Sequence, residues 1–162
     1  MITGGLRPGG RLPAACLAVA TATYASILLV ATHYPRPQVV IDRIMEQPAV
    51  RNVVRAPPSD TTMHLWAYAP LAMLAGATAV AGGWRSARSL VGLAAALALF
   101  AMLDQATQPL PWFRRTADIR DWISDCLGIA IGLAVVTWAA NRRRALPQGE
   151  PEPRAPGNGA GR

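Results

Sequence analysis

Three ionisable side chains lie within otherwise apolar stretches of this chain: His64, Asp104 and Asp125. Imidazole and carboxylate groups can accept or release protons, form ion pairs and bind divalent metals. Burying such a group without a partner is costly, particularly when it is charged. We therefore expect these three side chains to meet other polar groups inside the protein.

The region after residue 117 has the clearest periodic pattern. Asp118, Asp121, Asp125, Gly128 and Gly132 follow one another at intervals of 3, 4, 3 and 4 residues. On a helix with 100° per residue, this spacing keeps all five within an arc of about 80°. The two glycines form a small-xxx-small pattern that lets a neighbouring helix approach closely. That approach would turn the acidic end of the stripe inward.

Other polar residues should lie at the same end. Asp60, His64 and Tyr68 are spaced four residues apart and share a helix face, and Asp104 and Gln108 do the same in the next apolar stretch. Gln105 lies beside them, and the connection that follows brings in Arg114 and Arg115, with Arg120 shortly after. The predicted polar cluster comprises Asp60, His64, Tyr68, Asp104, Gln105, Gln108, Arg115, Asp118, Asp121 and Asp125.

Simpler roles compete with a binding site at the helix starts. Ser59 or Asp60 can cap the second apolar helix, and Asp118 with Asp121 can form a cap-like start to the fourth. A capping residue can also line a site, so both interpretations stay open for Asp60 and Asp118.

Deeper in the apolar stretches the alternative is a structural network. Asp104 and Asp125 are too far from the helix starts to be caps, but they could form ion pairs or hydrogen bonds, for example with Arg115, and His64 could be a hydrogen-bonded interior histidine. The chain lacks a serine nucleophile elbow, a His-Glu-x-x-His motif and a phosphate-binding loop. We therefore expect no catalytic residues, cofactor or metal. Aspartate pairs near a histidine could alternatively hold a divalent cation.

The composition indicates which elements position these residues. Hydrophobic residues make up 52% of the 162 residues and charged residues 15%, against about 25% charged in a typical soluble domain. A bilayer core of about 30 Å needs about 20 helical residues, and four segments qualify. We expect an all-α, integral membrane four-helix transmembrane bundle. The predicted spans are about residues 12–33, 63–83, 89–108 and 122–140.

The predicted domain organisation is simple. Residues 1–11 form an N-terminal cytoplasmic tail, residues 12–140 form the membrane domain, and the basic, Pro- and Gly-rich residues 141–162 form a disordered tail. The first span could instead be a cleaved signal peptide with Arg7 and Arg11 before it. Its apolar run is long for that role, and no convincing small-residue cleavage site follows, so we favour a retained helix.

Basic flanks are what membrane insertion requires, so the pI near 11 does not indicate nucleic-acid binding. With the N-terminus inside, seven arginines flank each side of the membrane. The run Arg142 to Arg144, directly against the fourth span, favours placing both termini in the cytoplasm. The polar cluster would then face the extracytoplasmic side. Cys16 and Cys126 should lie near opposite faces and therefore should not pair.

Three groups of residues resemble motifs of the VanZ-like family. One opens a helix as Ser59-Asp60-Thr61-Thr62-Met63-His64, followed by Tyr68, Pro70 and Leu71. The next is Asp104-Gln105-Ala106-Thr107-Gln108, which closes a helix. The last contains Arg115, Asp118, Asp121, Asp125, Gly128 and Gly132. The resemblance covers roughly residues 59–138. The chain departs from the family at Thr61, Gln105 and Asp125, where the family has a lysine, a glutamate and often an asparagine.

The resemblance implies a multi-pass protein of the bacterial cytoplasmic membrane, in a family whose founding member is associated with low-level glycopeptide resistance. The lipid bilayer is the expected partner, and the oligomeric state stays open. Two functions follow. In the favoured one, a non-enzymatic protein uses its extracytoplasmic polar cluster to bind a lipid headgroup, a cell-wall precursor or a lipophilic, glycopeptide-type compound. In the alternative, aspartate and histidine serve a membrane-embedded hydrolase or transferase acting on a lipid-linked substrate.

Overall fold

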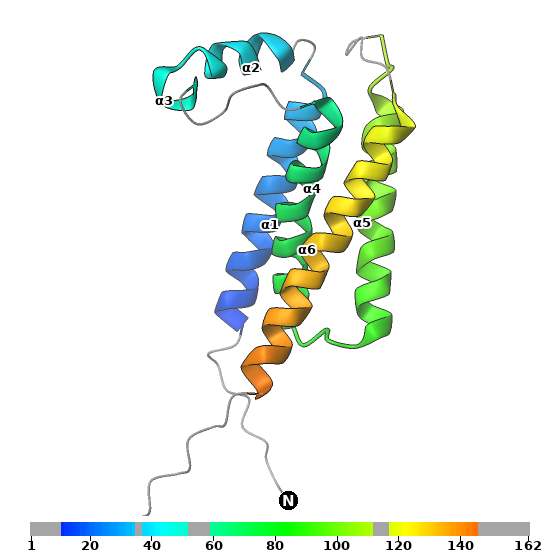
Figure 1. Cartoon of the computed structure of the whole chain (residues 1–162). Coiled ribbons are helices and arrows are strands. Elements are labelled where there is room, and N and C mark those ends of the chain that lie inside the picture. The colour runs from blue at the N-terminus through cyan, green and yellow to red at the C-terminus, as the bar shows by residue number, and fades with distance from the viewer. Residues whose placement is uncertain (1–10, 35–36, 52–58, 112–116, 146–162) are drawn as a thin grey trace, which may run out of the picture.

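Four long helices run side by side and form the body of the protein (Figure 1). The computed structural model describes residues 11–34, 37–51, 59–111 and 117–145, and the regular structure in these ranges is entirely helical. The helices are α1 (Arg11–Thr32), α2 (Pro37–Met45), α3 (Pro48–Arg51), α4 (Asp60–Ala81), α5 (Ala87–Thr107) and α6 (Ile119–Ala145). The short helices α2 and α3 lie outside the bundle, near the end of α1 (Figure 1).

The four long helices match the predicted apolar segments. Each contains a stretch long and apolar enough to cross a membrane: Ala14–Thr32, Asp60–Ala81, Ala87–Thr107 and Ile119–Arg143. The 22 residues of α4 extend over about 33 Å at 1.5 Å per residue, close to the thickness of a hydrocarbon core. The all-helical, four-helix prediction is therefore confirmed.

The helix boundaries differ from the predicted ones by a few residues. Helix α4 begins at Asp60 rather than 63, and α6 begins at Ile119 rather than 122. At its other end α6 continues to Ala145, so residues 141–145 are helical, and the rest of the predicted disordered tail lies outside the described residues. The arginines at 142–144 extend the helix because arginine is a good helix former even where the apolar pattern stops.

Local hydrogen bonds explain where two of the long helices begin. Ser59 is the N-cap of α4, and its Oγ accepts a hydrogen bond from the backbone N–H of Thr62 at 3.2 Å. Ser86 caps α5 in the same way, through the N–H of Ser89 at 3.1 Å. Between these helices Gly83 has a φ of 88°, which favours glycine. This short connection between Ala81 and Ala87 therefore lets α5 run antiparallel to α4.

Helices α4 and α6 form the closest-packed pair, and two glycines make this possible. A Cβ atom added to Gly128 would lie 2.5 Å from the carbonyl oxygen of Leu65, and one added to Gly132 would collide with the carbonyl oxygen of Ala69. Only glycine lets the two backbones approach this closely. The predicted packing role of Gly128 and Gly132 is confirmed.

Helices α1 and α5 pack onto this central pair from two sides. Helix α1 contacts α4 directly, where the Tyr24 hydroxyl donates to the Ala67 carbonyl at 3.0 Å and the hydroxyls of Thr21 and Thr78 lie 3.1 Å apart. Helix α5 packs mainly against α6, and the indole N–H of Trp122 donates to the Ala98 carbonyl at 3.2 Å. The bundle therefore consists of a central α4–α6 pair with α1 packed against α4 and α5 packed against α6.

The distribution of side chains is inverted relative to a soluble protein. The apolar core is small and contains Leu28, Tyr68, Leu71, Ala72, Ala101, Ile129 and Leu133. Large aliphatic residues are instead exposed along the long helices, including Val19, Ile27, Val30, Val91, Leu99, Leu103, Leu127 and Ile131. Many of the most buried side chains are polar. The packing thus gathers polar groups inside and leaves apolar groups outside.

Candidate functional site

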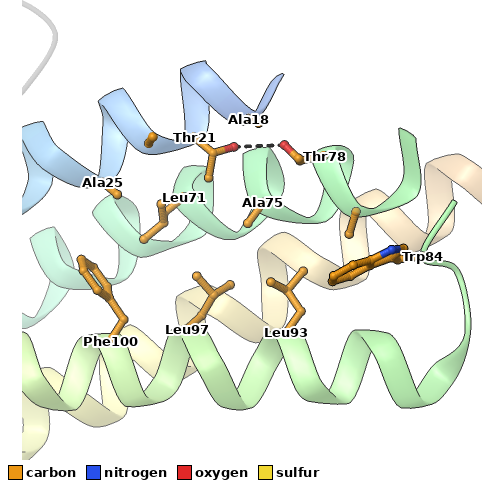
Figure 2. A pocket seen from close by; sticks show the side chains of 12 residues that line it. Ala18, Thr21, Ala25, Leu71, Ala75, Thr78, Trp84, Leu93, Leu97 and Phe100 are labelled. Atoms are coloured by element: carbon orange, nitrogen blue, oxygen red, sulfur yellow. Dashed lines mark hydrogen bonds between the residues drawn. The ribbon is translucent and has the colours of Figure 1, made fainter. Parts of the chain in front are cut away.

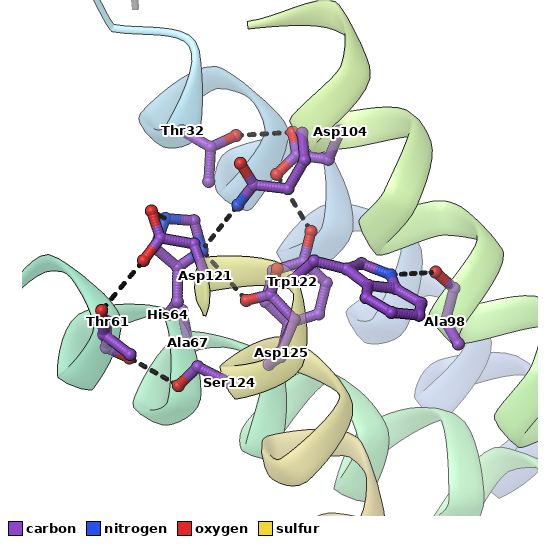
Figure 3. A network of polar contacts seen from close by, with 12 residues as sticks. Thr32, Thr61, His64, Ala67, Ala98, Asp104, Asp121, Trp122, Ser124 and Asp125 are labelled. Atoms are coloured by element: carbon purple, nitrogen blue, oxygen red, sulfur yellow. Dashed lines mark hydrogen bonds and ion pairs between the residues drawn. The ribbon is translucent and has the colours of Figure 1, made fainter. Parts of the chain in front are cut away.

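Polar side chains from all four long helices meet at one end of the bundle (Figure 3). This is the end where α1 and α5 finish and where α4 and α6 begin (Figure 1). We call this group the polar cluster and define it as Thr32, His33, Asp60, Thr61, His64, Tyr68, Asp104, Gln105, Gln108, Asp121, Ser124 and Asp125. Most of its members are buried, so the cluster forms a polar interior within an otherwise apolar bundle.

His64 of α4 and Asp125 of α6 form the central pair of the cluster. The Nδ1 atom of His64 lies 2.9 Å from Oδ1 of Asp125, and Asp125 is fully buried. The other ring nitrogen, Nε2, faces Oδ2 of Asp121 at 3.9 Å, which is too long for a hydrogen bond. The amide nitrogen of Gln105 lies 3.4 Å from Nδ1. The central pair therefore links α4 to α6, with α5 alongside.

Asp104 of α5 links three helices through its two carboxylate oxygens. The Thr32 hydroxyl of α1 donates to Oδ1 at 2.7 Å, and the Tyr68 hydroxyl of α4 donates to Oδ2 at 3.0 Å. The Nδ1 atom of His33 lies 3.3 Å from Oδ1, and its Nε2 lies 2.8 Å from the Thr107 hydroxyl. Hydrogen bonds to a charged acceptor are stronger than neutral ones, so Asp104 fastens α1 to the rest of the bundle.

Smaller hydroxyl groups hold the start of α4 against α6. The Thr61 hydroxyl donates to Oδ1 of Asp121 at 3.0 Å, and the Ser124 hydroxyl donates to the Thr61 carbonyl at 2.6 Å. These contacts orient the Asp121 carboxylate. Asp60, one residue earlier, is half-buried, and its carboxylate lies close to His64 and Asp121. This edge of the cluster is the part nearest the outside.

Three buried polar atoms in the cluster make no hydrogen bond within the described part of the chain. They are Oε1 of Gln105, Nε2 of Gln108 and Oδ2 of Asp125. Buried polar groups in native proteins are nearly always paired, with water or a ligand where no protein group is available. The cluster therefore has hydrogen-bonding capacity beyond what its own side chains use.

An apolar groove begins about one helical turn from the polar cluster and is lined by α1, α4 and α5 (Figure 2). Its volume is about 370 Å³, and α1 and α5 form its two walls with α4 between them (Figure 2). Leu71 and Phe100 line the groove and lie about one helical turn from Tyr68 and Asp104 of the cluster. The rings of Tyr68 and Phe100 are 6.3 Å apart. The Tyr68 ring therefore stands where the groove meets the cluster.

The structure brings together most of the predicted site residues. Six of them, His64, Tyr68, Asp104, Gln105, Asp121 and Asp125, are joined by the contacts above, while Asp60 lies at the edge and Gln108 is buried beside them. Arg115 lies outside the described residues.

Asp118 stands apart from the cluster, contrary to its predicted membership. It is exposed, and its Oδ1 accepts a hydrogen bond from the backbone N–H of Arg120 at 2.9 Å. This is the geometry of a helix cap, in which a side chain satisfies a free N–H of the first turn. The capping interpretation holds for Asp118, as it does for Ser59.

Sequence reasoning missed the contribution of α1 to the cluster. Thr32 and His33 close the first span, and Thr61 and Ser124 follow or precede predicted members on the same helices. A usable signal existed for His33, the one histidine in a first apolar segment without Asp, Glu, Lys or Arg. Hydroxyl residues give no such signal, because they also occur in transmembrane helices with hydrogen bonds to their own backbone. Cys16 and Cys126 are free thiols, as predicted.

Comparison with known proteins gives no match to this chain: no protein-family model fits it, and no curated protein or solved structure is significantly similar.

Proposed function

We propose that this chain is a VanZ-like, multi-pass protein of the bacterial cytoplasmic membrane, and that it binds the polar head of a lipid or of a lipid-linked cell-wall precursor without altering it chemically. The lipid chain would lie in the apolar groove, and the head would reach the polar cluster. The observation that carries the proposal is an apolar groove that comes within about one helical turn of a cluster in which three buried polar atoms have no hydrogen-bond partner among the described residues.

The outer surface supports a membrane location. Val19, Val30, Val91 and Leu127 are exposed on the long helices, and a water-soluble protein rarely exposes a large contiguous apolar surface. Hydrocarbon around the bundle would accommodate these side chains at no cost. The same environment explains why charged groups gather inside, since a charge facing lipid is expensive.

The arginines support an orientation with both termini in the cytoplasm. Helix α1 begins and α6 ends at the same end of the bundle (Figure 1). Arg142 and Arg143 lie on the last turns of α6, and Arg142 stacks over the ring of Trp138 at 4.4 Å. Basic residues near a span favour the cytoplasmic side, and tryptophan favours the interface. The polar cluster would then face the extracytoplasmic side.

A groove-filling substitution tests the proposal. Ala22 is exposed on α1 and lines the groove, whereas Ala20 is exposed on α1 away from it. We expect Ala22→Phe to reduce retention of a polyprenyl phosphate, measured by native mass spectrometry of the detergent-solubilised protein, by about tenfold, equivalent to about 1.4 kcal/mol. Ala20→Phe adds the same side chain to the same helix and should bind like the unmodified protein. Equal retention of the lipid by the two variants would contradict the proposal that the lipid chain lies in the groove.

Recognition of the lipid head by the polar cluster is tested separately, with Gln108→Leu. This substitution removes a buried amide nitrogen that has no hydrogen-bond partner among the described residues and should abolish any preference for polyprenyl phosphate over the uncharged polyprenol. Gln47, exposed next to α2, provides the matched control Gln47→Leu, which should keep the preference. If the unmodified protein retains both compounds equally, the cluster does not recognise the head.

One observation favours the enzymatic alternative. The His64–Asp125 pair at 2.9 Å resembles the base-and-orienting-carboxylate arrangement of general acid–base catalysis. A hydrolase acting on a lipid-linked pyrophosphate would release phosphate, and His64→Gln would stop that release. Unchanged polyprenyl pyrophosphate after prolonged incubation with the purified protein would leave binding as the function.

A further inference from the structure

The outer edge of the polar cluster gathers three groups that are common metal ligands. Asp60 and His64 lie one turn apart on α4, and Asp121 faces them from the start of α6. One ligand atom from each, two carboxylate oxygens and one ring nitrogen, all lie within 4.8 Å of one another. In a tetrahedral site with bonds of about 2.0–2.2 Å the ligand atoms lie about 3.3–3.6 Å apart, so side-chain shifts of about 1 Å would close the site.

The orientation of the His64 ring points one nitrogen at the two carboxylates. The ring is 5% exposed, and Asp125 occupies its Nδ1 atom at 2.9 Å. Within the described residues its Nε2 atom has no hydrogen-bond partner, and Oδ2 of Asp121 lies 3.9 Å away. A buried ring nitrogen at this distance from carboxylate oxygen is too far for a direct bond. The spacing suits an ion held between the two atoms.

The groups behind the three ligands are those that support metal sites in proteins. A metal-binding histidine usually donates its other ring N–H to a carboxylate, which fixes the ring and strengthens the ligand. Asp125 occupies that position behind His64. The Thr61 hydroxyl donates to Oδ1 of Asp121 and so leaves Oδ2 directed at the site. Both supporting contacts come from residues outside the three candidate ligands.

Acidic groups gather around the candidate ligands. Asp104, Asp121 and Asp125 are all buried, and Asp60 is half-buried beside them. The ion pairs of the three buried carboxylates within the described residues are made by His33 and His64. Carboxylates gathered in this way attract a divalent ion and are common ligands for it.

We propose that Asp60, His64 and Asp121 bind a divalent transition-metal ion, Zn²⁺ or Mn²⁺, at the outer edge of the polar cluster. One imidazole and two carboxylates form a borderline donor set that suits these ions better than Ca²⁺, which prefers oxygen ligands alone. Three protein ligands leave coordination positions for water or an anionic group. The site does not depend on the proposed lipid binding, since the ion is held by protein groups.

The first experiment measures metal binding directly. The detergent-solubilised full chain is stripped with chelator and titrated with Zn²⁺, Mn²⁺ and Ca²⁺ by calorimetry, and bound metal is quantified by elemental analysis. We expect about one Zn²⁺ or Mn²⁺ per chain and much weaker Ca²⁺ binding. Bound Mn²⁺ should show nitrogen hyperfine coupling in its electron paramagnetic resonance spectrum, because one ligand is a histidine. Absence of binding, or a bound ion without nitrogen coupling, would overturn the proposal.

Matched variants then identify the ligands. His64→Gln and Asp121→Asn should abolish binding, while Asp42→Asn, at an exposed position in α2, should bind normally. Asp125→Asn should weaken binding by about 10–100-fold, the effect of losing the group that orients a ligand, and Thr61→Ala should weaken it less. Normal binding by His64→Gln would contradict the site.

The unfolding temperature provides a measurement that does not depend on the ligand variants folding correctly. Saturating Zn²⁺ should raise the unfolding temperature of the unmodified protein and of Ala22→Phe equally, because a ligand stabilises the folded state it binds. Ala22→Phe is expected to lose lipid retention while keeping the metal, so a failure of the lipid proposal and a failure of the metal proposal are distinguishable. If Zn²⁺ did not raise the unfolding temperature of the unmodified protein, the metal proposal would fail and the lipid proposal would be unaffected.

Discussion

The two ends of the bundle are held together by different forces. At the end with the polar cluster, directional hydrogen bonds join all four long helices, and Asp104 alone connects α1, α4 and α5. In the other half, α4 and α6 are held by close backbone packing, for example at Gly132, while α1 and α5 form the separate walls of the groove (Figure 2). Close packing thus joins α4 to α6, whereas polar contacts position the outer helices α1 and α5.

Removing the Asp104 carboxylate should lower the free energy of unfolding more than the other substitutions below. Asp104→Ala leaves the Thr32 and Tyr68 hydroxyls and the His33 ring without their shared acceptor. Breaking a buried ionic interaction by removing one partner costs about 3–5 kcal/mol. We expect the free energy of unfolding in mild detergent to fall by that amount, and α1 to exchange its amide hydrogens faster near Thr32. Asp42→Ala, at an exposed position in α2, is the control and should leave both measurements unchanged.

Disturbing the glycine seam should have the next largest effect. The new Cβ atom in Gly128→Ala would lie 2.5 Å from the Leu65 carbonyl oxygen, so α4 and α6 must move apart. Overpacking of this kind costs about 1–3 kcal/mol, measured as a lower free energy of unfolding. Gly92→Ala places the same methyl group in α5, where nothing lies within 4 Å, and should be neutral or stabilising by up to about 1 kcal/mol. Equal effects of the two substitutions would show that the seam does not need glycine.

The smallest effect should come from removing one of the hydrogen bonds between the middle of α1 and α4. Tyr24→Phe removes the hydroxyl that donates to the Ala67 carbonyl at 3.0 Å and should cost about 0.5–1.5 kcal/mol. Tyr34→Phe, at an exposed position after α1, is the matched control. If Tyr24→Phe destabilised the protein as strongly as Asp104→Ala, α1 would be held along its whole length and the contrast between the two ends would disappear.

Much of the fold follows from local patterns in the sequence. The four apolar stretches are long enough that helix is the structure that satisfies their backbone in an apolar environment. Spacing also placed Asp121, Asp125, Gly128 and Gly132 on one face of α6, because helical periodicity depends only on neighbouring residues. The end of α6 was less predictable, since the arginines after residue 141 continue the helix although the apolar pattern has stopped.

Tertiary structure decided which polar groups meet. The sequence could place His64, Asp104 and Asp125 at the same end of the bundle, but it could not show that His64 pairs with Asp125 while Tyr68 and Thr32 pair with Asp104. Nor could it separate Asp118, which caps α6, from Asp121, which faces α4. A helix face is a property of its own residues, whereas a partner depends on how closely two helices approach and how they cross. For the His64–Asp125 pair that approach is set by Gly128 and Gly132, which pack against the backbone of α4, a helix distant in the sequence.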